Sequence, residues 1–208
     1  MKLRLKFICT IIFALSLSAC AGKPGDSGKA EEILKVNMQQ AAESADQIVQ
    51  RTLSSVVPPL QWTHQTSTDT LCLDATSDSH GLGAVTRRAV VMTKVSAERR
   101  GGLLGVVERQ WKKSGYKITS VNSNKDSPAI FAESSDGYRL GLIVGSAGQF
   151  FLEVATPCAK QSDVARPRTK AAGQDYYERK VPGPNVDDAF WSAEEPLPSA
   201  SPTSPSGN

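Results

Sequence analysis

The chain has 208 residues, with 24 Lys and Arg against 21 Asp and Glu, and 39% of its residues are hydrophobic. This length accommodates one domain with appendages and excludes a large multidomain enzyme. A net charge of +3 excludes a strongly basic protein that coats nucleic acid, so no nucleic-acid partner is expected. The composition is too apolar for a wholly disordered chain and too polar for a protein with several membrane spans.

The first residues have the order of a secretory signal peptide. Met1–Lys6 carries three cations and no acid, Phe7–Leu17 is almost wholly apolar, and Ser18 and Ala19 are small. A basic start, a short apolar stretch and a small-residue cleavage site are typical of exported proteins. The apolar stretch is shorter than the roughly 20 residues that a membrane-spanning helix needs. We therefore expect residues 1–19 to be cleaved, which leaves 21 basic and 21 acidic side chains.

The residues at the cleavage site, Leu17, Ser18, Ala19 and Cys20, resemble the lipobox of bacterial lipoproteins. The resemblance implies a thioether-linked diacylglycerol on Cys20, which becomes the first residue of the mature chain. A cysteine thiolate is a nucleophile that can accept the lipid. Two fatty acyl chains, palmitate among them, anchor a protein stably, whereas one is marginal. The resemblance places the protein on the outer face of the cell membrane, or on the outer membrane of a Gram-negative organism. The alternative is an ordinary secreted protein.

Two cysteines remain after this processing. Cys9 leaves with the signal peptide and Cys20 is lipidated, so Cys72 and Cys158 are left, 86 positions apart. An extracytoplasmic compartment permits disulfides, and we expect these two cysteines to be joined. Closing a loop of this length corresponds to a stabilisation of about 4–5 kcal/mol in the chain-entropy treatment. The alternative is a pair of free or metal-binding thiols.

Composition divides the mature chain into three parts. Residues 20–29 contain the anchor and a Gly- and Pro-containing tether, and residues 30–160 alternate periodic apolar segments with turns, as a folded domain does. Residues 161–208 are polar and rich in Pro and Ser, without Lys or Arg after Lys180. We expect this last part to be a disordered tail. Its acidic island with two aromatics, Asp187–Glu195, is either a docking motif or simply part of the tail.

Two helices are predicted. Apolar residues recur at three- and four-residue steps over residues 30–57, and Pro58 ends this helix. Ser96 is a candidate N-cap for a second helix, with Gly115 as its stop. Glycines weaken the first turns of this second helix, so a start at Gly102 stays open.

Two strands are predicted first, over Leu60–Ala75 and Ala84–Val95, from their apolar and β-branched residues. Asp136-Gly137 is a strong hairpin signal within the later strands. The connections between those strands are short, which favours an antiparallel meander. We expect an α+β fold in which two helices cover one face of a sheet, made of one or two N-terminal strands and a four-stranded meander. The meander strands are Tyr116–Asn122, Ala129–Ser135, Tyr138–Gly145 and Gln149–Thr156.

The sequence shows no catalytic motif, and whether the protein is an enzyme stays open. His64 and His80 have no partners at metal-ligand spacing, so neither a metal nor a cofactor is expected. The glycines of Gly101–Gly105 lack the spacing and the Lys-Ser/Thr of a phosphate-binding loop. Partners in a catalytic site need not be adjacent in sequence, so an enzyme with a dispersed site remains an alternative.

A basic segment runs from Val85 to Lys125, with ten cations against Glu98 and Glu108. Cations near an anionic leaflet each contribute about 1 kcal/mol of attraction. The segment is either a contact surface for anionic lipid, wall polymer or an acidic envelope protein, or a solvated face that acids elsewhere compensate. The candidate contact residues are Arg87, Arg88, Arg99, Arg100, Arg109, Lys112 and Lys113.

The chain also resembles small extracytoplasmic lipoproteins of high-GC Gram-positive bacteria over residues 17–158. Besides the lipobox, the resemblance rests on Trp62 with Cys72, the Gly115-Tyr116 strand start and the ending at Thr156–Cys158. It carries over no functional residue except Cys20. The sequence thus predicts a lipid-anchored envelope protein that acts as a non-enzymatic binding module of unknown ligand. The alternatives are an enzyme with a dispersed site and a structural envelope factor that acts through its acidic tail.

Overall fold

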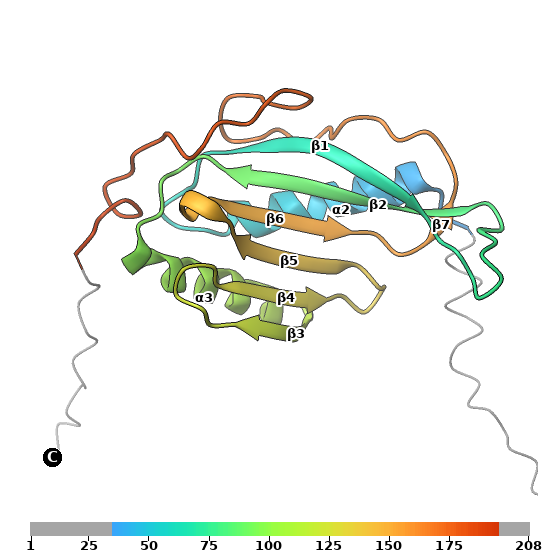
Figure 1. The fold of residues 1–208 in the computed structure, drawn as a ribbon, viewed down its shortest axis with the longest axis horizontal. Coiled ribbons are helices and arrows are strands. Elements are labelled where there is room, and N and C mark those ends of the chain that lie inside the picture. Colours follow the sequence, from blue (N-terminus) through green and yellow to red (C-terminus); the bar gives the residue numbers. More distant parts are fainter. Residues whose placement is uncertain (1–34, 196–208) are drawn as a thin grey trace, which may run out of the picture.

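The computed structural model describes residues 35–195, which form an α+β domain (Figure 1). Residues 1–34 and 196–208, with the predicted signal peptide, lipobox and tether, lie outside this range. The described elements are α2 (Met38–Ser54), β1 (Trp62–Leu71), β2 (Leu82–Val91), α3 (Ala97–Lys113), β3 (Lys117–Asn122), β4 (Ala129–Glu133), β5 (Arg139–Val144), a short 3-10 turn η1 (Ser146–Gly148), β6 (Phe150–Ala155) and β7 (Ala159–Lys160).

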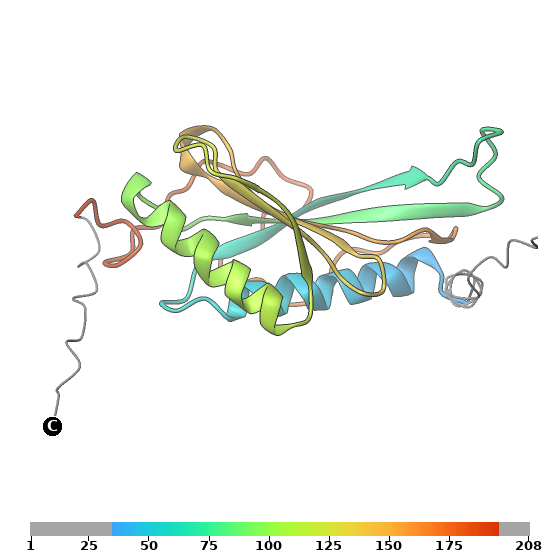
Figure 2. The same ribbon diagram turned by 90° about the horizontal axis from the view of Figure 1, so that it is seen from below.

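The sheet has seven antiparallel strands in the order β1-β2-β6-β5-β4-β3, and β7 pairs with β2. The strands β3 to β6 follow one another as a meander, and the β1–β2 hairpin adds to it through β2 beside β6. Both helices lie on the same side of the sheet (Figure 2). The predicted fold class is therefore confirmed, including the four-stranded meander and its two N-terminal strands.

The helix α2 starts later than its apolar periodicity indicates. Asn37 caps the helix, because its side chain accepts a hydrogen bond from the Gln40 N–H while the Gln40 side chain accepts one from the Asn37 N–H. One face of the helix is small and apolar, with Ala41 and Ala45 at most 1% exposed, and packs on the sheet. The helix ends at Ser54, four residues before its predicted stop at Pro58.

The helix α3 begins at Ala97, directly after Ser96, so the alternative start at Gly102 is wrong. The Ser96 side chain makes no cap hydrogen bond and donates instead to the Ala193 carbonyl at 2.5 Å. Gly115 follows the helix with a φ of +80°, as the C-terminal glycine of a helix commonly does. On the buried side, Trp111 Nε1 donates to Thr52 Oγ1 of α2 at 3.0 Å and joins the two helices.

The disulfide between Cys72 and Cys158 is formed, as the sequence predicts. Cys72 follows β1 and Cys158 precedes β7, so the bond ties the end of the β1–β2 hairpin to the chain that leaves β6. It closes the end of the sheet at which α2 begins.

The C-terminal segment, residues 161–195, is not the disordered tail that its composition predicts. It runs past β1 and continues to the opposite end of the domain, beside α3 (Figure 1). Its backbone bonds to the domain, for example from Trp62 N to the Ala172 carbonyl at 2.9 Å and from Lys94 N to the Val186 carbonyl at 2.8 Å. Trp191 is 2% exposed and shares the main core with the other two tryptophans.

The acidic island of the C-terminal segment is part of the fold. Asp187 forms an ion pair with Lys94 at 3.0 Å, and the Asp188 carboxylate accepts hydrogen bonds from the N–H groups of Phe190 and Trp191. Average composition predicted disorder because it gives no weight to single anchors such as Trp191, whose burial stabilises a whole segment. Residues 196–208 lie outside the described range.

We expect Trp191→Ala to lower the unfolding free energy by about 3–5 kcal/mol, because it empties a large site in the core. Trp191→Phe keeps an aromatic ring but removes the hydrogen bond from Nε1 to the Pro58 carbonyl, 2.8 Å in the structure, and we expect it to be milder. Urea denaturation of both variants measures the two effects. A loss below about 0.5 kcal/mol for the alanine variant, typical of a surface site, would contradict the packing of this segment.

Candidate functional site

A cleft of about 550 Å³ opens at the end of the domain that carries the disulfide. Its walls come from the start of α2, from the turn between β4 and β5, and from residues 157–159 after β6. Val36, Pro157 and Ala159 give it an apolar side, and Glu133 and Asp136 give it carboxylates.

The polar rim of the cleft is built by the β4–β5 turn. Gly137 adopts a φ of +88°, which the predicted Asp-Gly turn requires. Ser134 Oγ donates to Asp136 Oδ1 at 2.5 Å and accepts from the Tyr138 N–H at 2.9 Å. This side-chain network fixes Asp136 at the rim, where its carboxylate is one of the groups that line the cleft.

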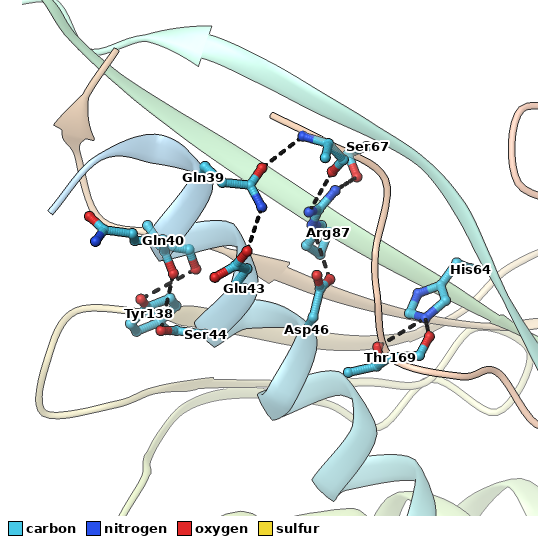
Figure 3. Close-up of polar contacts among 12 residues, drawn as sticks. Gln39, Gln40, Glu43, Ser44, Asp46, His64, Ser67, Arg87, Tyr138 and Thr169 are labelled. Carbon is cyan, nitrogen blue, oxygen red and sulfur yellow. Dashed lines mark hydrogen bonds and ion pairs between the residues drawn. The ribbon is translucent and has the colours of Figure 1, made fainter. Parts of the chain in front are cut away.

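Tyr138 forms the inner boundary of the cleft against α2. It is 6% exposed, and its hydroxyl donates to the Ala41 carbonyl at 3.4 Å. Burial raises the pKa of Tyr138, and a hydrogen bond from Ser44 partly opposes this (Figure 3). The phenol therefore stays neutral at physiological pH and serves as a positioned hydrogen-bonding group. Among the described residues that line it, the cleft has two acids and no base, so it suits a ligand that donates hydrogen bonds and has an apolar part.

A buried ion pair lies further along α2 and holds the helix to the sheet. Arg87 is 1% exposed and Asp46 2% exposed. Arg87 Nε lies 3.0 Å from Asp46 Oδ1, which is ion-pair distance without the alignment of a hydrogen bond. The guanidinium also donates to Ser67 Oγ at 2.7 Å and to the Ala165 carbonyl at 2.9 Å (Figure 3).

The surroundings of Asp46 shift its titration. Burial raises the pKa of Asp46 to about 6, although the charge of Arg87 opposes the shift, and the charge of Glu43 also raises the pKa. The carboxyl is therefore ionised and paired with Arg87 at neutral pH, and takes up a proton in mildly acidic solution.

The two imidazoles have separate environments. His64 is buried edge-on against Trp62, and its Nε2 lies 2.9 Å from the Thr169 carbonyl of the C-terminal segment. Burial lowers the pKa of His64, so it remains neutral and structural. His80 lies in the exposed β1–β2 loop, where its Nε2 is 2.8 Å from Asp74 Oδ2. Hydrogen bonds from Thr76 and then from His80 hold the pKa of Asp74 below its usual range. Within residues 35–195 no three His, Cys, Asp or Glu residues are grouped to hold a metal ion.

The predicted basic contact residues do not lie on one surface. Arg87 and Arg99 are buried, and Arg99 Nε donates to the Phe190 carbonyl at 3.0 Å. Arg88 pairs with Glu153 at 2.8 Å, and Lys112 pairs with Glu108 at 2.6 Å. Arg100 lies against the turn at Gly148, and Arg109 and Lys113 are exposed on α3.

One signal in the sequence could have placed Arg87 inside. Arg87 follows Val85 and precedes Ala89 at two-residue steps along β2, and both neighbours are buried apolar residues, so the strand period assigns all three to the same face. The structural role of the C-terminal segment left no comparable signal, because its anchors are scattered and aperiodic.

None of the helices within residues 35–195 has the length and apolar content required to cross a membrane.

The sequence matches no protein-family model and no curated protein. Two solved structures show similarity to the fold. A DUF4853 family protein from Actinomyces odontolyticus matches with a TM-score of 0.41 and 10% identity over 61% of this chain and 68% of that one. The "putative lipoprotein LppA" from Mycobacterium tuberculosis matches with a TM-score of 0.37 and 12% identity over 58% of this chain and 75% of that one.

The titration of Asp46 has a consequence for stability. Between about pH 4 and pH 6 the folded chain holds a proton on Asp46 that the unfolded chain has released, so the unfolding free energy falls as pH rises through this window. The fall from this one group is about 2–3 kcal/mol. We expect the unfolding free energy of the wild type, relative to that of Asp46→Asn, to fall by that amount from pH 4 to pH 7.

Denaturation at a series of pH values measures this difference. His64 opposes Asp46 in part of the window, since a lowered pKa makes stability fall as pH falls, but it is present in both proteins and cancels. Glu43→Gln, on the same helix, is the matched control and should retain most of the pH dependence. Parallel profiles for the wild type and Asp46→Asn would contradict the raised pKa.

Proposed function

We propose that the chain is a lipid-anchored extracytoplasmic envelope protein that acts as a binding module. The observation that carries the proposal is the Cys72–Cys158 disulfide, which uses both cysteines that remain after cleavage before a lipidated Cys20. Structural disulfides persist in oxidising compartments and are rare in the cytosol. The disulfide and the lipobox resemblance are independent features, and both support a location outside the cytoplasm.

The length of the tether limits how far the domain can lie from the anchor. Fourteen residues, 21–34, separate Cys20 from the first described residue, and an extended chain of that length spans at most about 50 Å. The cleft between α2 and the β4–β5 turn is lined by Val36, close to the point where the tether joins the domain. An anchor at Cys20 therefore keeps the cleft within this distance of the membrane.

The cleft supports binding as the activity. Its apolar wall and the carboxylates Glu133 and Asp136 provide recognition of a ligand with donor groups, and neither His64 nor His80 lines it. The proposed ligand is a molecule of this chemical class.

The anchor is tested by Cys20→Ser in a bacterial host that processes lipoproteins. We expect the wild type in the membrane fraction, with a mass that corresponds to residues 20–208 plus lipid, and we expect the variant to lose the lipid mass and the cleavage before residue 20. Cys9→Ser is the matched control, because Cys9 would leave with the signal peptide. Unchanged membrane retention and mass of Cys20→Ser would refute the lipid anchor.

The compartment is tested by thiol labelling of the same material. Alkylation of denatured protein without a reductant should label neither Cys72 nor Cys158, and alkylation after reduction should label both. Breaking the bond by Cys72→Ala with Cys158→Ala should lower the unfolding free energy by about 2–5 kcal/mol. Two free thiols in the exported protein would contradict an oxidising compartment.

A further inference from the structure

A second hollow, of about 220 Å³, lies on α3 at the end of the domain away from residue 35. Its walls are α3 itself, Val57 from the connection between α2 and β1, and Phe190 with Trp191 from the C-terminal segment. Both views of the molecule place this part of the C-terminal segment beside the first turns of α3 (Figures 1 and 2). We call this hollow the α3 pocket.

The inner basic group of the α3 pocket is Arg99. Its side chain is 94% buried, since the residue is 6% exposed, and its guanidinium carbon lies 5.2 Å from the centre of the Phe190 ring. Arg99 Nε donates to the Phe190 carbonyl, but Nη1 is buried and has no hydrogen-bond partner among the described residues. A buried donor without a partner is costly, and an acceptor that reaches it would remove that cost.

The outer basic group is Arg109. Arg99, Gly102, Val106 and Arg109 follow one another at three- and four-residue steps, so they share one face of α3. Arg109 forms no ion pair with any described residue, and its Nη1 folds back toward Gly105, where the absence of a side chain leaves room. None of the described residues that line the α3 pocket is a carboxylate. Two guanidinium charges therefore share one pocket without a counter-charge from residues 35–195.

The remaining walls are apolar. Val57 is 77% exposed although it is a large aliphatic residue, and Phe190 is 36% exposed. Together with Val106 and Trp191 they form an apolar surface, and its burial under an apolar group of a ligand is favourable in free energy. The combination of unpaired guanidinium groups and an apolar wall selects a ligand with both characters, because the planar fork of arginine binds phosphate and carboxylate oxygens in pairs.

We propose that the α3 pocket binds an anionic amphiphile, in which a phosphate or carboxylate group contacts Arg99 and Arg109 and a short apolar chain lies on Val57, Val106 and Phe190. This goes beyond the proposed anchor and cleft, since it concerns a different end of the domain and holds whether or not Cys20 is lipidated. The small volume admits one headgroup with a short chain, and a longer chain extends into solvent or remains in a bilayer.

The test is calorimetric titration of the chain 21–208, which keeps every described residue, with hexyl phosphate as the probe. Inorganic phosphate and hexyltrimethylammonium are titrated beside it. We expect saturable one-to-one binding of hexyl phosphate, at least about tenfold weaker binding of inorganic phosphate, and none of the cation. Equal affinity for phosphate and hexyl phosphate would overturn the apolar half of the site, and an absence of hexyl phosphate binding would overturn the proposal.

Variants separate the pocket from general electrostatic attraction. Arg109→Gln removes an exposed charge without emptying the core, and we expect it to weaken hexyl phosphate binding by about tenfold or more. Lys113→Gln is the matched control, since it removes the same charge from the same helix one turn beyond the pocket. Equal losses in the two variants would overturn the pocket. Arg99→Lys, checked for an unchanged thermal midpoint, should weaken binding because lysine lacks the guanidinium fork.

Two sources could supply this chemistry, a membrane lipid and a soluble amphiphile. Sedimentation of the chain 21–208 with vesicles that contain phosphatidic acid distinguishes them. Sedimentation that Arg109→Gln abolishes and Lys113→Gln does not would support a lipid headgroup as the ligand. Binding of hexyl phosphate in the titration, without sedimentation of the protein with the vesicles, would support a soluble amphiphile as the ligand. Sedimentation without any binding of hexyl phosphate would count against the pocket, because it indicates attraction to a charged surface.

Discussion

The guanidinium of Arg87 joins three parts of the chain that lie far apart in sequence. It contacts Asp46 on α2, Ser67 on β1 and the Ala165 carbonyl of the C-terminal segment. A charge that is 1% exposed is tolerated only when a counter-charge and hydrogen-bond acceptors surround it, and removal of one partner of such a pair is strongly destabilising. The helix, the edge strand and the C-terminal segment therefore depend on one another, and the domain needs all three to be complete.

The rest of the architecture secures the two ends of this sheet by different means. The Cys72–Cys158 disulfide closes the end at which α2 begins, and Trp191 closes the end at which α3 begins. Each closure leaves a hollow beside it. The cleft near the disulfide has carboxylates in its lining, and the α3 pocket has arginines. A disulfide-linked segment bounds the cleft, and a tightly packed segment bounds the α3 pocket. The fold itself therefore sets the shapes of both hollows.

The periodic parts of this fold were open to prediction from sequence, and the aperiodic parts were not. Alternation along the strands, the Asp136-Gly137 turn and the paired cysteines identified the meander and its closure, because each feature has a local physical cause. The C-terminal segment was assigned wrongly, since a single buried Trp191 outweighs many polar neighbours. The cleft and the α3 pocket were also beyond prediction, because each is lined by three segments that only the tertiary structure brings together.

The basic segment shows why a count of charges along a chain does not describe a surface. Arg87 and Arg88 are neighbours in β2, and the strand period places the first against Asp46 in the core and the second beside Glu153 on the other face. Folding thus pairs three cations of the segment, Arg87, Arg88 and Lys94, with acids from elements distant in sequence. A local excess of positive charge lies in the α3 pocket, where the helical period aligns Arg99 and Arg109 beside apolar walls and none of the described lining residues is a carboxylate. Specific recognition of an anion requires such a local excess, since a uniform basic surface attracts without selecting.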